Sequence, residues 1–158
     1  MTYKNNKVKD FLYEQESYLI RGACFEVWKE FKGMFKESVI EKALTIALKN
    51  KKLKVETQKR IDIYFQEEKV GTYVPDIIVN GCVLIELKSK LILTKQDEEQ
   101  FWKYLKGSQY KLGFLINFSP TGLVIKRIVY DKVRNQRTSA NNQRTNQRQI
   151  SGQNKIKR

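Results

Sequence analysis

The chain opens with two stretches in which apolar residues recur every three or four positions. Between Phe11 and Phe31 this spacing is typical of an amphipathic helix, and Gly33 follows as a helix-stopping residue. The same spacing returns between Phe35 and about Asn50, where a lysine-rich end suits a helix C-terminus. The pattern therefore predicts a fold that begins with two helices.

From residue 55 onward, apolar and polar residues alternate, which is the period of a β-strand. The expected strands cover 55–65, 70–79, 82–88, 111–118 and 122–130, and a helix is expected at 95–106. That helix allows a parallel crossover from 82–88 to 111–118, and the nearly continuous apolar character of 111–118 indicates a strand covered on both faces. The sequence thus predicts an α/β or α+β fold with a mixed sheet.

The amino-acid composition excludes several kinds of catalytic and metal site. The 158 residues include no histidine, which excludes Ser-His-Asp triads, Cys-His nucleophiles and histidine-ligated zinc. Cys24 and Cys82 are too few for a disulfide framework or a four-cysteine zinc site. No apolar run approaches the roughly 18 residues that a membrane helix needs. Any catalysis must use carboxylates, lysine, tyrosine or a metal that prefers oxygen ligands.

Positive charge is in large excess, with 31 Lys and Arg against 17 Asp and Glu, a net charge of +14. Residues 134–158 repeat an Asn-Gln-Arg triplet and contain no acidic residue. We expect 1–133 to form the folded domain and 134–158 to be a disordered tail, either a tolerated extension or a basic arm that binds phosphates. A charge of this size suits nucleic acid or an anionic membrane surface as partner.

The strand at 82–88 carries two charged residues among aliphatic ones. Alternation puts Glu86 and Lys88 on one face of the sheet, and charged groups are seldom buried without a partner. Asp76 lies across a turn at Asn80-Gly81. A two-residue turn would set Asp76 opposite Ile85, on the other face from Glu86. A three-residue loop would instead set it opposite Leu84, and all three charged groups would share a face.

Two converging carboxylates without histidine suit Mg²⁺ or Mn²⁺, which prefer oxygen ligands and keep several waters. Such an ion activates water and polarises a phosphoryl oxygen, while a neighbouring lysine stabilises developing charge. The alternative for Asp76, Glu86 and Lys88 is an ordinary salt bridge on a half-exposed sheet. Tyr73, just before Asp76, is a weaker candidate for contact with a substrate.

Pro75-Asp76, followed after nine residues by Glu86-Leu87-Lys88, resembles the active-site signature of the PD-(D/E)XK nuclease superfamily, and the wider sequence resembles its small GxxExxxR branch. The similarity covers roughly residues 11–130. Besides the signature, the similar blocks are IRGACFEVWKEF at 20–31, FKESVIEKAL at 35–44, GTYVPDIIV at 71–79, EEQFWKYLK at 98–106 and KLGFLINF at 111–118.

This resemblance implies a restriction-endonuclease-like α/β/α core with a mixed central sheet, and it implies a role for each matching residue. Asp76, Glu86 and the backbone carbonyl of Leu87 would bind the metal, and Lys88 would position the attacking water. Glu37 corresponds to the acidic residue that such nucleases often supply from a preceding helix. Gln100 corresponds to a glutamine on the helix after the signature strand.

Two positions depart from the branch pattern. Met34 stands three residues before Glu37 where the branch has glycine, and Glu41 stands four residues after it where the branch has arginine. The resemblance implies Mg²⁺- or Mn²⁺-dependent hydrolysis of phosphodiester bonds, with nucleic acid rather than a membrane as partner. The alternative is a catalytically inactive nuclease-fold module that binds nucleic acid or protein. Because the start MTYKNNKVKD is polar and lacks a secretory signal, we expect a cytoplasmic protein. The sequence does not separate DNA from RNA and predicts no oligomeric state.

Overall fold

The computed structural model describes residues 11–33 and 35–131. The proposed tail at 134–158, and the disorder predicted for it, lie outside the described residues. Within the described ranges, no helix combines the length and the apolar character required to cross a membrane.

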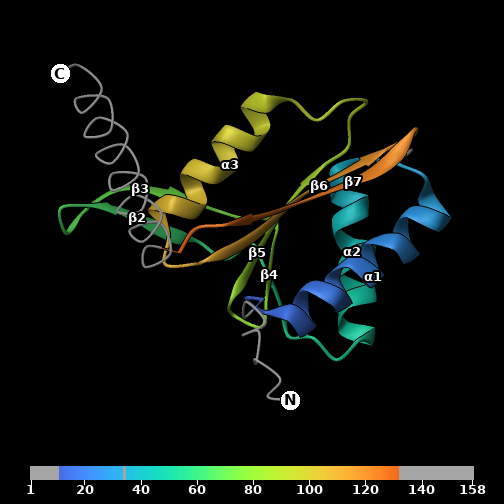
Figure 1. Cartoon of the computed structure of the whole chain (residues 1–158), viewed down its shortest axis with the longest axis horizontal. Helices are drawn as coiled ribbons and strands as arrows, with labels where there is room; N and C mark the ends of the chain where they lie inside the picture. Colours follow the sequence, from blue (N-terminus) through green and yellow to red (C-terminus); the bar gives the residue numbers. More distant parts are fainter. Residues whose placement is uncertain (1–10, 34, 132–158) are drawn as a thin grey trace, which may run out of the picture.

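Helices cover both faces of a central sheet (Figure 1). The helices are α1 (Glu14–Phe31), α2 (Glu37–Asn50) and α3 (Lys95–Gly107). The strands are β1 (Val55–Thr57), β2 (Ile61–Phe65), β3 (Glu68–Tyr73), β4 (Ile77–Val79), β5 (Val83–Lys88), β6 (Leu112–Ser119) and β7 (Gly122–Val129). Helices α1 and α2 pack on one face of the sheet and α3 packs on the other, so the predicted α/β/α core is confirmed.

The central sheet has the order β1-β4-β5-β6-β7. Strands β5 and β6 pair in parallel, with α3 as the crossover between them, and the other neighbouring pairs are antiparallel. Every residue of β6 is buried, as its apolar sequence predicts for a strand covered on both faces. The mixed sheet predicted from the sequence is therefore confirmed.

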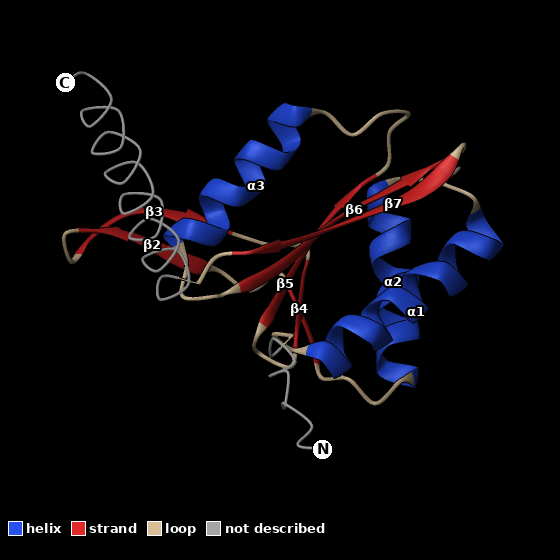
Figure 2. Ribbon diagram, viewed as in Figure 1, coloured by secondary structure: helices blue, strands red, loops and turns tan. Residues whose placement is uncertain are grey.

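Two of the predicted strands are each divided in the structure. The stretch 55–65 forms β1 and β2, and the stretch 70–79 belongs to β3 and β4, with β3 beginning at Glu68. Strands β2 and β3 form a separate two-stranded sheet that lies beside α3 (Figure 2). Proline lacks the N–H of a ladder bond, so Pro75 interrupts one strand, and Gln58, with a left-handed φ of 58°, interrupts the other.

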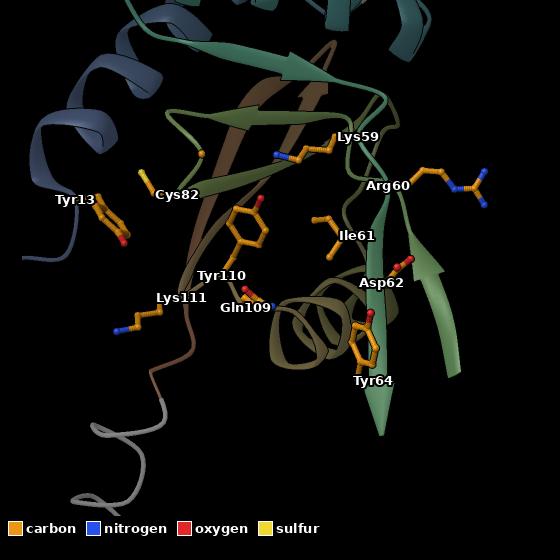
Figure 3. A pocket seen from close by; sticks show the side chains of 11 residues that line it. Tyr13, Lys59, Arg60, Ile61, Asp62, Tyr64, Cys82, Gln109, Tyr110 and Lys111 are labelled. Atoms are coloured by element: carbon orange, nitrogen blue, oxygen red, sulfur yellow. The ribbon is translucent and has the colours of Figure 1, made fainter. Parts of the chain in front are cut away.

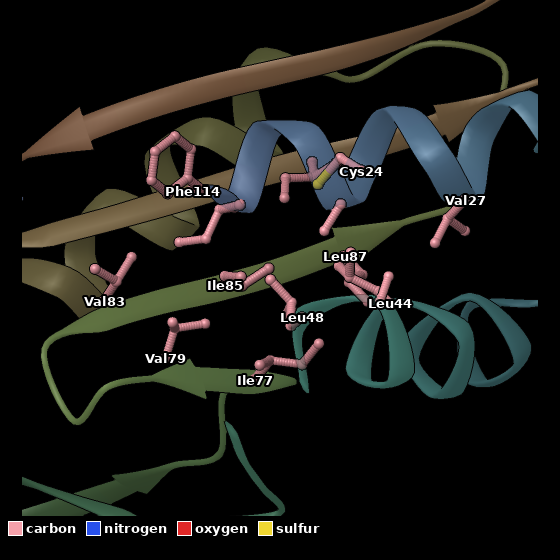
Figure 4. Close-up of a cluster of buried hydrophobic side chains, with 14 of the residues drawn as sticks. Cys24, Val27, Leu44, Leu48, Ile77, Val79, Val83, Ile85, Leu87 and Phe114 are labelled. Carbon is pink, nitrogen blue, oxygen red and sulfur yellow. The ribbon is translucent and has the colours of Figure 1, made fainter. Parts of the chain in front are cut away.

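Two hydrophobic clusters hold the layers together. The larger one joins α1 and α2 to the sheet and contains Cys24, Leu44, Ile85 and Phe114 (Figure 4). The smaller cluster joins α3 to the opposite face. Because Ile85 belongs to the larger cluster, the alternation of β5 turns Glu86 and Lys88 toward α3.

The pairing of β4 with β5 differs from both alternatives derived from the sequence. Val79 pairs with Val83 and Ile77 with Ile85, which extends to place Asp76 beside Glu86 rather than opposite Leu84 or Ile85. The reversal takes the three residues 80–82. Asn80 and Gly81 have left-handed φ values of 50° and 64°, the Cys82 N–H donates to the Val79 carbonyl, and pairing resumes at Val83. The backbone N–H of Asn80 donates to the Lys54 carbonyl, and its Oδ1 accepts from the Lys54 N–H. Asp76, Glu86 and Lys88 therefore share one face of the sheet, as a common site requires, through a pairing that the sequence did not predict.

Candidate active site

Asp76 reaches β5 at the point where β4 begins. The chain bends at Asp76, directly after Pro75, and the pairing of β4 with β5 ends at Ile85. The N–H of Leu87 instead donates to Oδ2 of Asp76, at 2.6 Å. This bond fixes the Asp76 carboxylate at the edge of β5.

The Leu87 carbonyl faces the same edge as the Asp76 carboxylate. The N–H and C=O of one strand residue point to the same side, and the Leu87 N–H points toward Asp76. The side chain of Leu87 is buried in the larger hydrophobic cluster. Leu87 can therefore offer only a backbone oxygen to this site, which is the role that the resemblance implies for it.

Glu86 and Lys88 lie side by side on the α3 face. Nζ of Lys88 donates to Oε1 of Glu86 at 3.1 Å, and both side chains are partly exposed. Burial disfavours the charged amine, but Glu86, Glu37 and Asp76 outweigh burial and raise the pKa of Lys88. Lys88 is therefore a protonated donor at neutral pH.

Tyr73 has a role that the sequence did not reveal. Its hydroxyl donates to Oε2 of Glu86 at 2.5 Å, and its ring stacks on Tyr104 of α3 with centroids 4.2 Å apart. Burial and the neighbouring Glu86 raise the pKa of Tyr73, so the phenol keeps its proton. The hydrogen bond from Tyr73 holds Glu86 in place. Because Tyr73 is only 7% exposed, it offers little surface to a substrate. Its position in the sequence, on a different strand from Glu86, carries no signal for this contact.

Helix α2 brings two further carboxylates toward the end of β5. Oε1 of Glu37 accepts a hydrogen bond from the N–H of Ser89, the residue after the strand. Glu41 lies one helical turn further on and acts electrostatically on Asp76. Burial, together with the charges of Glu86 and Glu41, raises the pKa of Asp76 to about 6. In the sequence Glu41 stands out only as a departure from the branch pattern, although its i, i+4 spacing from Glu37 is a signal for a shared helix face.

Gln100 lies on α3 and lines one small depression together with Glu86 and Lys88. Asp97 lines the same depression, and its side chain caps α3 by bonding the backbone N–H of Thr94. Burial opposes the charge of Asp97, but the Lys90 amine and the bonds from Thr94 lower its pKa to about 2. The structure thus gathers the predicted residues around the end of β5, with Glu37 reaching it from the α2 side.

The protein side chains at this site do not by themselves complete the coordination of a metal ion. Across residues 11–33 and 35–131, no three Asp, Glu or Cys side chains cluster tightly enough to hold a metal ion. The site offers two carboxylates, Asp76 and Glu86, and the Leu87 carbonyl. This donor set fits Mg²⁺ or Mn²⁺, which commonly take one or two carboxylates and complete their coordination with water. The raised pKa of Asp76 agrees with this fit, because it reflects burial and an excess of negative charge that a cation would relieve.

A second hollow, of about 440 Å³, lies at the other end of β5 and contains none of the predicted site residues. Figure 3 shows Lys59 and Tyr110 facing one another across it, with Cys82 and Tyr13 on one side. Lys59 is already paired there with Glu56, at 2.8 Å. The predicted site carboxylates Asp76 and Glu86 thus lie at the carboxyl end of β5, away from this hollow.

A mixed sheet between helices, with acidic residues and a lysine converging where two central strands part, defines the class of nuclease-like α/β proteins. Residues 14–128 match the family model described as PD-(D/E)XK nuclease superfamily. The chain belongs to this superfamily. A solved structure described as "Crystal structure of SSO0001" is similar with a TM-score of 0.41 and 16% identity, over 74% of this chain and 79% of that one. No curated protein matches the sequence.

Proposed function

We propose that this protein is a metal-dependent nuclease that hydrolyses phosphodiester bonds in nucleic acid. The observation that carries the proposal is the placement of Asp76, Glu86 and Lys88 at the end of β5, where Asp76 accepts from the Leu87 N–H, Lys88 donates to Glu86, and the charges of Glu86 and Lys88 act on Asp76. Membership of a nuclease superfamily supports the same reaction class. The net charge of +14 supports a polyanionic substrate, which such a surface would collect in a salt-sensitive way.

In this proposal Asp76, Glu86 and the Leu87 carbonyl hold a Mg²⁺ or Mn²⁺ ion. When bound, such an ion lowers the pKa of a water molecule and polarises the phosphoryl oxygen. The contact between Asp76 and the Leu87 N–H keeps one ligand at the strand edge before an ion arrives. Tyr73 and Lys88 hold the two oxygens of Glu86, so the second carboxylate is also positioned in advance.

Lys88 has the further role of orienting the attacking water and stabilising charge that develops on the phosphate. Its amine stays protonated because it lies among acidic groups, so it donates hydrogen bonds rather than acting as a base. We assign Glu37 and Gln100 supporting roles at the rim of the site, on the α2 and α3 sides respectively. The further placement in the GxxExxxR branch is part of the proposal, and Glu41 would then replace the arginine of that branch.

The test is cleavage of single-stranded, duplex and structured DNA and RNA by purified protein with Mg²⁺, Mn²⁺ or EDTA. Lys88→Met should lower kcat by about 100-fold or more without unfolding the protein, since it removes a donor at the developing charge. Lys49→Met, at an exposed position near the end of α2, is the control with the same charge change. Absence of cleavage in any metal, or full activity of Lys88→Met, would contradict the proposal.

The hydrogen bonds of the site favour one second candidate, a non-catalytic module that binds nucleic acid. Both oxygens of Glu86 and one oxygen of Asp76 already accept bonds from the chain itself. Stabilisation of the sheet would by itself be a sufficient role for such a network, without any metal or catalysis. Binding of nucleic acid that is unaffected by EDTA, with no cleavage, identifies this alternative.

A further inference from the structure

The β5–α3 loop, residues 89–93, leaves the catalytic strand and exposes two large aliphatic side chains. The loop follows Lys88 directly and leads into the N-terminus of α3 (Figure 1). Leu91 is 71% exposed and Ile92 is 75% exposed. Two adjacent aliphatic residues this exposed, next to a proposed active site, call for a physical reason.

Buried polar groups hold this loop in one conformation. Asn117 of β6, only 1% exposed, accepts from the Lys90 N–H at 3.1 Å and donates to the Lys90 carbonyl at 2.8 Å. Ser119, 2% exposed, donates to the Leu91 carbonyl at 3.2 Å. On the other side of the loop, the Ser89 hydroxyl donates to the Phe35 carbonyl at 2.7 Å.

The rest of the loop is tied down as well. The Lys90 amine pairs with Asp97 of α3 at 2.5 Å, and Leu93 packs against the smaller hydrophobic cluster. Residues on both sides of Leu91 and Ile92 are therefore fixed to the body of the protein. The two aliphatic side chains project from a backbone that the core specifies, and they do not belong to a loosely held turn.

Three lysines lie beside the loop or at its ends, and two of them pair with acidic residues. Lys36 of the α1–α2 connection and Lys95 at the start of α3 are both exposed, and Lys88 lies at the base of the loop. Leu91 is three residues beyond Lys88, so their backbones are at most about 11 Å apart. At the 3.4 Å rise of stacked nucleotides this reach spans about three base steps, and unstacked nucleotides lie further apart, so three steps is the upper limit.

The sugar-phosphate backbone gives lysines a partner, but it offers no apolar face to leucine and isoleucine. The faces of the bases are apolar and could contact these side chains, but in a regular duplex they are covered by stacking. Aliphatic wedges contact base faces only where a step is unstacked, as at a kink, an end or a single-stranded segment.

We propose that Leu91 and Ile92 form an apolar wedge that contacts an unstacked base within about three nucleotides of the cleaved phosphate. The substrate class is then single-stranded or distorted nucleic acid rather than regular duplex. This inference rests on the proposed nuclease function, which it refines. The anchoring of Lys90 by Asn117 keeps the wedge at a constant distance from Lys88.

The test begins by mapping where the wild-type protein cuts a single-stranded oligonucleotide. Binding is then measured in EDTA, where cleavage is absent, for oligonucleotides with and without an abasic position within three nucleotides of the cut. Wild-type protein should lose about tenfold in affinity for the abasic strand, and the variant Leu91→Ser/Ile92→Ser should show little difference between the two strands. Both side chains are exposed, so the variant should keep the wild-type Tm.

Two control variants separate the wedge from general effects. Val70→Ser changes an aliphatic residue that is 61% exposed on β3 and should behave as wild type. Lys36→Gln/Lys95→Gln should lower affinity for every strand and reduce the salt dependence, because it removes phosphate contacts. The wedge variant should leave the salt dependence unchanged.

The inference would be overturned if the abasic position weakened binding equally in the wild type and the wedge variant. It would also be overturned if the wedge variant lost affinity equally for single strand and duplex. Conversion of a dimer to a monomer by the wedge variant, with unchanged affinity for both strands, would identify the loop as a protein contact and also overturn it. In these cases the wild-type protein still cleaves, so the nuclease proposal stands. A wild-type protein that neither cuts nor binds nucleic acid overturns both.

Discussion

Replacing Asp76 by asparagine should make the metal-free protein more stable at neutral pH. Burial and the charges of Glu86 and Glu41 raise the pKa of Asp76 from 3.8 to about 6. A shift of about two pKa units corresponds to roughly 3 kcal/mol at 1.36 kcal/mol per unit. Because Asp76 is only partly buried, solvent screening reduces this cost to about 1–2 kcal/mol. The asparagine amide would keep an oxygen for the Leu87 N–H and remove the charge.

The sign of the pH dependence follows from the raised pKa. The unfolded chain has a carboxyl pKa near 3.9, so wild-type stability falls as the pH rises from about 4 to about 6 and changes no further above that. The advantage of Asp76→Asn should therefore be complete at pH 7.5 and almost absent at pH 4. In a domain of this size, 1–2 kcal/mol corresponds to an increase of about 4–8 °C in Tm.

The assay is thermal unfolding followed by circular dichroism in EDTA at several pH values. Added Mg²⁺ should then raise the Tm of the wild type and leave Asp76→Asn unchanged, since a ligand that binds only the folded state stabilises it. Asp62→Asn is the control, because a nearby Lys69 lowers the pKa of Asp62 and removal of its charge should give no gain. A lower Tm for Asp76→Asn in EDTA at pH 7.5, or the same gain at pH 4, would refute the reasoning.

Three further substitutions test other contacts. Gly33→Ala should destabilise the protein by about 3 kcal/mol, because φ is 68° and an added Cβ would lie 2.3 Å from the Phe118 carbonyl oxygen; urea unfolding measures this. Asn117→Ala should cost about 2–3 kcal/mol by the same method, since it leaves the buried backbone groups of Lys90 without their partner. Tyr73→Phe should lower metal-dependent kcat/KM about tenfold, because a bond to a charged group is worth about 1.5 kcal/mol.

Each of these has an outcome that goes against it. Gly71→Ala, where no atom lies within 4 Å of the added methyl group, should be near neutral, and equal losses at both glycines would remove the steric argument. An Asn117→Ala protein as stable as wild type would mean that water replaces the amide. A Tyr73→Phe protein with unchanged kcat/KM would show that Glu86 needs no donor from Tyr73.

The elements of the fold were largely predictable because their patterns are local. The helical spacing of the first 50 residues predicted the two helices α1 and α2, and the apolar run at 111–118 predicted the buried strand β6. The division of 55–65 and 70–79 was not predicted, since alternation continues across the break. Only the left-handed backbone at Gln58 and the missing N–H at Pro75 mark where the strands leave the central sheet.

The candidate site depended on information of a different kind. Period-2 alternation was enough to put Glu86 and Lys88 on one face. The position of Asp76 depended on the strand register, and the turn residues suggested two registers that are both wrong. The tight turn at Asn80-Gly81 forms, but Cys82 stays outside the strand pairing, so Val79 pairs with Val83. The Tyr73 contact likewise joins residues from different strands, which no local pattern reports.

The most direct test of the central claim is titration of the purified protein with Mn²⁺, followed by electron paramagnetic resonance of the free ion. The wild-type protein should bind one ion tightly per chain. Asp76→Asn and Glu86→Gln should each weaken this site at least tenfold, and Asp62→Asn should not. Wild-type protein that binds no Mn²⁺, or binding that survives both substitutions unchanged, would contradict the claim that these carboxylates form a metal centre.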